Sequence, residues 1–440
     1  MKRQLPSEPN LEQLRIQAKE LRKAHQTADP AALQRIRESH PRLANAALEE
    51  VRSAEFTLSD AQLVLAREYG FASWPKLKAH VEALAVERGD PLELFHQAFK
   101  ADDAARVRRL FARFPEFKAR INEPLPDCGD PIITMARSRE MIDVLVEAGA
   151  DINAKSNWWA GGFGLLHSAK PDLAQHAIAR GARVDVHAAA RLGLIDELRA
   201  LISARPELVN ERGGDGQTPL HFASTIEVAR FLLDHGAEID PRDVDHESTP
   251  AQYMTGDRKE IARFLVQRGC TTDILMAAAL GDAELARHHL DRDPECVRVR
   301  VSDEYFPMVG GKNGGTIYQW TLGWYVSAHQ VAKSLGHDAI YRLLMERSPA
   351  DVRFVAALWL GDTETVSSIL AAQPNIVASL SAADRRHVAH ASRNNETAAA
   401  TRMLAAGLPV DSRGQHGATP LHWAAWHGNR DLVQTILRYN

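Results

Sequence analysis

A phrase of the form Gly-x-Thr-Pro-Leu-His-x-Ala occurs twice in this chain, as GQTPLHFAS at 216–224 and as GATPLHWAA at 417–425. In each copy the threonine can cap free backbone N–H groups, and the proline suits the first helical position, where its missing N–H is no loss. The leucine and the small residues after it form a short apolar face. The phrase therefore predicts a helix start, and its two copies predict a repeated structural unit.

A second helical stretch follows the phrase and ends at a glycine, as in IEVARFLLDHGAEID at 226–240, where Gly236 is expected in a left-handed C-cap. The same ending recurs in EMIDVLVEAGADIN (140–153), EIARFLVQRGCTTD (260–273) and AAATRMLAAGLPVD (398–411). A helix–turn–helix unit of this size cannot bury its apolar face alone, so each unit needs neighbours. The sequence predicts a solenoid of stacked helical units.

These motifs resemble the ankyrin repeat, whose period is about 33 residues. The resemblance is strongest at 216–240 and 417–437 and weaker through most of 92–412. It implies an all-α solenoid of helix–turn–helix units with hairpin-like tips, whose tips and first helices form one concave surface. It also implies that His221 and His422 hydrogen-bond locally and tie neighbouring turns together, so we interpret both histidines as structural.

Residues 1–88 do not follow the repeat, so we predict a small helical N-terminal domain at 1–88 and an ankyrin-repeat array at 89–440, with an irregular insertion at about 301–325. The segment AREYGFASWPKLKAH (66–80) resembles a helical segment found ahead of ankyrin arrays in bacterial proteins, and it can cap the solenoid. The last repeat stops at TILRYN. Either the chain is truncated at Asn440 relative to its relatives, or its final repeat ends bare.

Two details of the N-terminal domain follow from its local sequence. We expect Ser59 to cap a helix whose first turn contains Asp60. We interpret Phe71 and Trp74 as the aromatic anchors of a small core.

The composition excludes several classes of protein. Lys and Arg number 53 against 57 Asp and Glu, a formal net charge of −4, which is too near neutral to suggest nucleic-acid binding. The three cysteines, Cys128, Cys270 and Cys296, are scattered, which favours a reducing compartment and offers no cysteine zinc site. We recognise neither a signal peptide at the start nor an apolar run of membrane-spanning length. We therefore expect a cytoplasmic, monomeric protein with no nucleic-acid or membrane partner.

Three stretches break the repeat pattern: SNWWAGGFGLLHS at 156–168, RDVDHESTPAQYM at 242–254, and the insertion at 301–325. Packed helices lie about 8–10 Å apart, so successive tips are close neighbours. Aromatic rings mixed with acids and histidines are typical of a small-ligand or sugar-binding cleft, or of a peptide hot spot. The alternative is that these rings fill gaps left by irregular repeats. The candidate ligand-binding residues are Trp158, Trp159, His167, Asp243, Asp245, His246, Tyr253, Tyr305, Tyr318, Trp320 and Trp324.

The resemblance implies that the concave surface binds a partner protein, and this is our leading functional hypothesis. The second hypothesis is a small-molecule pocket, sugar-binding or enzymatic, formed by the three irregular stretches. It predicts that six side chains meet in one cavity, namely Trp158, Trp159, His246, Tyr305, Trp320 and Trp324.

An enzyme of this kind would use carboxylates and histidine in the cleft for acid–base chemistry. The candidates for that role are Asp245, His246, Glu247, Asp303 and Glu304. The sequence lacks the usual motifs for metal, nucleotide or hydrolase sites, so we expect neither a metal nor another cofactor. The sequence favours binding over catalysis.

Overall fold

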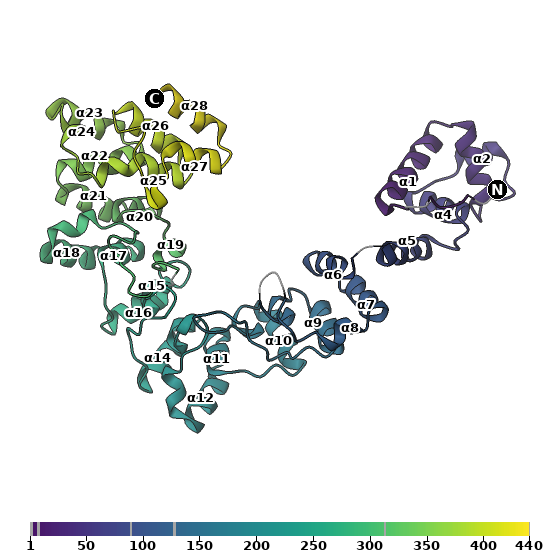
Figure 1. The fold of residues 1–440 in the computed structure, drawn as a ribbon, viewed down its shortest axis with the longest axis horizontal. Helices are drawn as coiled ribbons and strands as arrows, with labels where there is room; N and C mark the ends of the chain where they lie inside the picture. Colours follow the sequence, from purple (N-terminus) through teal and green to yellow (C-terminus); the bar gives the residue numbers. More distant parts are fainter. Residues whose placement is uncertain (1–2, 7–8, 89, 126–128, 312–313, 440) are drawn as a thin grey trace. The chain divides into compact units, whose positions relative to one another are not determined.

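The computed structural model describes residues 3–6, 9–88, 90–125, 129–311 and 314–439 (Figure 1). The regular secondary structure of these residues is helical, and they pair elsewhere only through isolated β-bridges. This confirms the all-α prediction. The chain forms two compact units, one of residues 1–121 with 137–150 and the other of residues 122–136 with 151–440.

The first unit begins with a helical bundle that has its own apolar core. Its helices are α1 (Leu11–Gln26), α2 (Pro30–Ser39), α3 (Leu48–Ser53), α4 (Leu58–Glu68) and α5 (Trp74–Arg88). Phe71 and Trp74 are partly buried against this core, as predicted. The unit also contains α6 (Pro91–Lys100), α7 (Ala104–Arg113), α8 (Glu116–Ala119) and α9 (Arg139–Glu147). The domain boundary at residue 88 stays a prediction.

The prediction that Ser59 caps the helix that contains Asp60 was wrong. That helix is α4, which begins at Leu58, and its N-cap is Thr57. The Thr57 hydroxyl accepts the Asp60 N–H, and the Asp60 carboxylate accepts the Thr57 N–H at 2.9 Å. This reciprocal capping box satisfies two free donors at once, which a cap at Ser59 would leave open.

The second unit is a row of helical hairpins. In chain order its elements are η1 (Ile132–Met135), η2 (Leu165–His167), α10 (Pro171–Ala179), α11 (Val186–Leu192), α12 (Ile195–Ala204), η3 (Pro206–Asn210), η4 (Gly214–Gly216), α13 (Pro219–Phe222), α14 (Ile226–Asp234), α15 (Pro250–Tyr253), α16 (Lys259–Gln267), α17 (Ile274–Leu280), α18 (Ala283–Arg292), η5 (Pro294–Arg298), α19 (Tyr318–Thr321), α20 (Ala328–Ser334), α21 (Asp338–Arg347), α22 (Ala350–Leu360), α23 (Thr363–Ala372), α24 (Ile376–Ser379), η6 (Asp384–Arg386), α25 (His387–Arg393), α26 (Thr397–Ala405), η7 (Gln415–Gly417), α27 (Pro420–Trp426) and α28 (Arg430–Arg438). The first helix of a hairpin packs on its own second helix and on the first helix of the next hairpin, as α11 does on α12 and α13.

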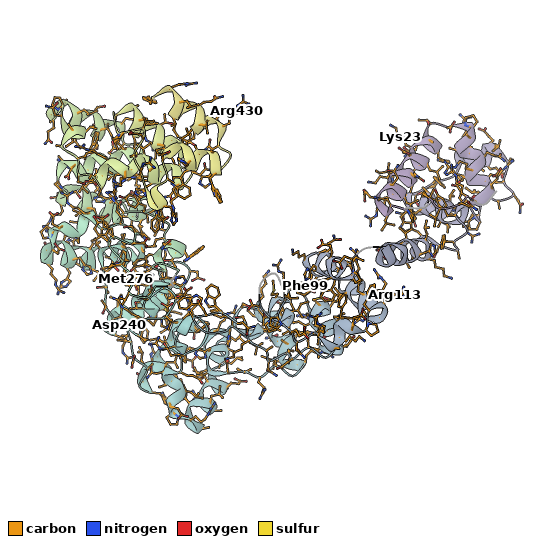
Figure 2. The ribbon with its side chains drawn as sticks, viewed as in Figure 1. Lys23, Phe99, Arg113, Asp240, Met276 and Arg430 are labelled. Carbon is orange, nitrogen blue, oxygen red and sulfur yellow. The ribbon has the colours of Figure 1, made fainter. Side chains whose placement is uncertain are left out.

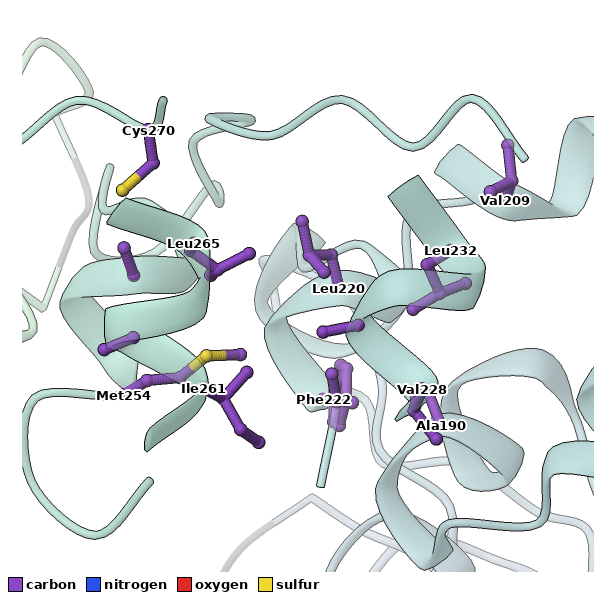
Figure 3. Close-up of a cluster of buried hydrophobic side chains, with 14 of the residues drawn as sticks. Ala190, Val209, Leu220, Phe222, Val228, Leu232, Met254, Ile261, Leu265 and Cys270 are labelled. Atoms are coloured by element: carbon purple, nitrogen blue, oxygen red, sulfur yellow. The ribbon is translucent and has the colours of Figure 1, made fainter. Parts of the chain in front are cut away.

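Each hairpin buries its apolar face only by packing against its neighbours. Leu220 of α13, Leu232 of α14 and Leu265 of α16 are all fully buried in one cluster that runs through three hairpins (Figure 3). Met276 continues the cluster into α17 (Figure 2). Burial of this kind stabilises the array by about 1.5–3 kcal/mol per large apolar side chain, so a lone hairpin would lose most of its stability.

Polar side chains at the ends of three repeats bind the backbone of the following repeat. Asn153 accepts the Arg183 N–H at 2.7 Å, and Asn210 accepts the Glu238 N–H at 2.9 Å. Asp240, labelled in Figure 2, accepts the N–H of the threonine at 271 at 2.8 Å. The Asn or Asp that ends these three repeats in the sequence is therefore a structural tie between repeats.

The Thr-Pro-Leu-His motif forms a second tie. His221 accepts the Thr218 N–H on Nδ1 at 3.1 Å, so its Nε2 carries the hydrogen and donates to the Ser248 carbonyl oxygen at 3.2 Å. Burial lowers the pKa of His221 to about 3, so this imidazole is neutral at pH 7. The second helix ends as predicted, with Gly236 at a φ of 92°. His422 bonds to Thr419 of its own turn in the same way, but its side chain is exposed.

The two motif histidines form a matched pair for mutagenesis. We expect His221→Ala to lower the free energy of unfolding by about 1–3 kcal/mol more than His422→Ala, because only the first change leaves buried donors and acceptors unpaired between two repeats. Urea denaturation of both variants, followed by circular dichroism, measures the difference. Equal losses in the two variants would contradict the role of His221 as an inter-repeat tie.

Candidate functional site

The three irregular stretches of the sequence meet around one residue, Asp215, at the hairpin tip between α12 and α13. The Asp215 N–H donates to the Gly161 carbonyl oxygen at 3.3 Å, and its own carbonyl oxygen accepts the Val244 N–H at 2.7 Å. The next tip continues the series, because the Asp245 carbonyl oxygen accepts the Gly314 N–H at 2.9 Å. We call this series of backbone contacts, through residues 161, 215, 244–245 and 314, the tip ladder. It joins 156–168, 242–254 and 301–325 edge to edge.

Glycines permit the close approach of these backbones. A Cβ on Gly161 would lie 2.3 Å from the Gly213 carbonyl oxygen, and one on Gly314 would lie 2.6 Å from Cε1 of His246. Gly161 also has a φ of 126°, a conformation that side chains disfavour. Both glycines come from the Gly-Gly pairs that distinguish the irregular stretches in the sequence.

Two of the predicted acids are occupied in holding this structure together. The Asp243 carboxylate accepts the Ser248 N–H at 2.7 Å and the Tyr253 hydroxyl at 2.9 Å, and it also accepts the His246 N–H. The Glu247 carboxylate accepts the backbone N–H groups at positions 309 and 310, at 2.9 and 2.7 Å. Asp243 therefore stabilises the hairpin tip at 242–248, and Glu247 binds the backbone of the insertion to that tip.

The remaining polar side chains of the tips form a compact group of Asp215, Asp245 and His246. One ligand atom of each residue lies within 4.8 Å of the others, so together they could hold a metal ion. His246 donates from Nδ1 to the Gly315 carbonyl oxygen at 2.7 Å, because a carbonyl oxygen can only accept. Its Nε2 lies 3.6 Å from Oδ2 of Asp245.

The electrostatics of this group differ from those of an exposed acidic loop. Burial and the negative charge of Asp245 raise the pKa of Asp215 to about 6, partly offset by His246 and by a hydrogen bond from the Trp158 side chain. A carboxyl group with that pKa exchanges its proton near neutral pH, so the group has the chemical means for either proton transfer or cation binding.

An open pocket of about 360 Å³ lies beside this group, on the face formed by the first helices. Tyr253 links the two, since its ring packs edge-on against His246 at 6.0 Å and also lines the pocket. The pocket carries two arginines, Arg191 of α11 and Arg258, which lies just before α16. It is lined by His167, Pro171, Arg191, Leu192, Gln217, His221, Phe222, Ser224, Tyr253, Asp257 and Arg258.

Other candidate ligand residues have structural partners or face solvent. His167 is buried and hydrogen-bonds through Nε2 to the Asp185 carboxylate at 2.9 Å, in the manner of a motif histidine. Tyr318 is fully buried and donates its hydroxyl hydrogen to Asp273 at 2.9 Å. By contrast, Trp158, Trp159 and Trp320 are 47%, 46% and 74% exposed.

Trp324 belongs to a different group, at the far end of the insertion. Its ring packs against the Arg393 guanidinium at 4.2 Å, and the neighbouring Tyr325 ring stacks on His390 at 3.5 Å. The charged neighbours of Tyr305 include Arg300 and Glu304, and Asp303 is a charged neighbour of Arg393. We call this group, of Arg300, Tyr305, Trp324, Tyr325, His387, His390 and Arg393, the arginine–aromatic cluster.

The predicted site residues thus separate by their contacts. Trp158, Asp243, Asp245, His246, Glu247 and Tyr253 come together at the tip ladder, whereas Asp303, Glu304, Tyr305 and Trp324 lie at or beside the arginine–aromatic cluster. The structure does not bring the six aromatic and histidine side chains into one cavity.

The structure also places Asp215 in the candidate site, a residue that the sequence analysis missed. A signal was available, because Asp215 and His246 both lie three residues before the motif threonine, at 218 and 249.

Comparisons with known proteins agree with this architecture. The family model for ankyrin repeats (3 copies) matches residues 186–276 and 328–440, and the stretch between these matches contains the insertion. The chain is similar to the E3 ubiquitin-protein ligase XB3 of Oryza sativa subsp. japonica, with 35% identity over 86 residues. That similarity covers 19% of this chain and 19% of the ligase. Among the described residues, no helix combines the length and apolar character that crossing a bilayer requires.

Proposed function

Because this chain carries ankyrin repeats, which generally mediate protein–protein interaction, we propose that it binds a partner protein through the surface formed by its hairpin tips and first helices. The observation that carries the proposal is the pair Trp158 and Trp159, two neighbouring tryptophans that are each about half exposed. Tryptophan is enriched among residues that dominate binding energy, and a preformed tip limits the entropy lost on binding.

The proposal gives the pocket and the tryptophans different roles. The pocket on the first-helix face is large enough for one or two side chains of a partner, and its arginines favour an acidic partner segment. The Trp158 side chain interacts with Asp215, so it stands at the tip ladder. A cytoplasmic, monomeric protein is part of the same proposal, supported by the free thiols of Cys270 and Cys296.

Affinity capture tests the proposal. The full chain, the double variant W158A/W159A and the control Y439A are used as bait in a lysate of the source organism, and bound proteins are quantified by mass spectrometry. Tyr439 is a suitable control because it is 46% exposed, a fraction close to that of Trp158, and follows α28, the second helix of its hairpin. We expect a partner that wild type and Y439A retain equally and that the double variant retains at least about tenfold less, as for loss of a hot spot. Equal recovery by all three baits contradicts the proposed surface.

The arginine–aromatic cluster supports a second candidate function, the binding of a small anionic molecule. Arg300 is only 3% exposed, and its Nη1 has no hydrogen-bond partner among the described residues. The indole nitrogen of Trp324 is also buried without a partner. Asp384 is a charged neighbour of Arg300, but the unpaired N–H groups of Arg300 and Trp324 are destabilising, and a carboxylate or phosphate group that accepts from both would remove that cost.

Thermal unfolding in phosphate tests this candidate. Inorganic phosphate should raise the melting temperature of wild type and of Arg298→Gln above that in sodium chloride of equal ionic strength, and Arg300→Gln should abolish the rise. Arg298 is the matched control, because it already pairs with Asp351 at 2.7 Å. The same rise in Arg300→Gln, or none in wild type, contradicts anion binding at Arg300.

A further inference from the structure

The carboxylate of Asp245 is buried in the tip ladder without the hydrogen bonds that a buried carboxylate normally has. Asp245 is 6% exposed, and no described residue donates a hydrogen bond to its side chain. Nε2 of His246 lies 3.6 Å from Oδ2 of Asp245, which is beyond hydrogen-bond distance. Asp243, two residues away in the same tip, accepts three hydrogen bonds. The donors available to this tip are therefore used by Asp243, and Asp245 needs another positive partner.

The surrounding side chains are arranged as metal ligands are. His246 uses Nδ1 to bond the Gly315 carbonyl oxygen, which leaves the lone pair of Nε2 directed toward Asp245 and Asp215. A metal-binding histidine usually has its other ring nitrogen held in this way, which fixes its tautomer and its orientation.

We propose that Asp215, Asp245 and His246 bind one divalent transition-metal ion, with Zn²⁺ and Mn²⁺ as the best matches. One imidazole and two carboxylates favour these ions over Ca²⁺ and Mg²⁺, which prefer oxygen ligands alone. Donors bound at about 2.1 Å in a tetrahedral site lie about 3.4 Å apart. The 3.6 Å between His246 and Asp245 is already close to that spacing, and a carboxylate oxygen of Asp215 lies within 4.8 Å of both ligand atoms.

Three protein ligands leave coordination positions for water or for a group from a binding partner. The ligands come from two successive tips, at 215 and 245–246, and His246 is in turn bonded to the insertion. Metal binding would therefore crosslink two repeats and the insertion. It would also place a cation with free coordination positions beside the exposed Trp158. The inference concerns the ion alone and does not depend on the proposed partner protein.

Isothermal titration of the metal-free full chain with Zn²⁺ tests the site. We expect a single strong binding event in wild type, weakened at least about tenfold in Asp245→Asn and in Asp215→Asn, which remove ligand charge with little change in shape. The control is Asp196→Asn, an exposed carboxylate in α12, which should bind as wild type does. Ca²⁺ at the same concentrations should produce no comparable event.

A structural readout separates loss of ligands from loss of fold. Circular dichroism should show each variant as helical as wild type, and Zn²⁺ should raise the melting temperature of wild type and Asp196→Asn only. If Asp245→Asn proves unfolded, the comparison rests on Asp215→Asn, whose carboxylate lies at the more exposed side of the group. Undiminished Zn²⁺ binding in the folded Asp variants, or no strong binding in wild type, overturns the proposal.

Discussion

The close contact between successive hairpin tips is the interaction on which the rest of this site depends. Backbone hydrogen bonds connect Gly161 to Asp215, Asp215 to Val244, and Asp245 to Gly314. Each bond alone contributes about 1 kcal/mol, but the series fixes the relative register of loops that are far apart in the sequence. Side chains on those tips, among them Trp158, Asp245 and His246, are therefore positioned by the backbone before any ligand arrives.

The helical hairpins supply the rigidity that such a ladder needs. Their buried leucines form continuous cores across repeats, and polar ties such as His221 to the carbonyl oxygen of Ser248 fix neighbouring turns to one another. The insertion has no repeat pattern of its own, so Glu247 holds it through two backbone N–H groups instead. A regular scaffold thus supports an irregular surface, and the irregular surface is where unusual charge and exposed tryptophan occur.

The repeat motifs predicted much of this fold, because each motif acts locally. The threonine and histidine of the motif form the bonds expected of them, and Gly236 adopts the left-handed cap. The candidate site was only partly predictable. Its residues at 242–254 could be chosen for their composition, but the only sequence signal for Asp215 is its place three residues before the motif threonine, which His246 shares. The sequence also could not show that Trp324 and Trp158 belong to different groups of residues, because their positions depend on the path of the insertion.

Hydrogen–deuterium exchange on the unmodified protein tests the tip ladder most directly. If the ladder forms, the backbone amides at 244–245 and at 314 are protected to a similar degree, far above the level of an unbonded loop, because they open only when adjacent tips separate. Peptides spanning these positions report that protection by mass spectrometry. Exchange of the amide at 314 at the rate of a free loop, with 244–245 still protected, would show that the insertion is not joined to the tips and would contradict the account.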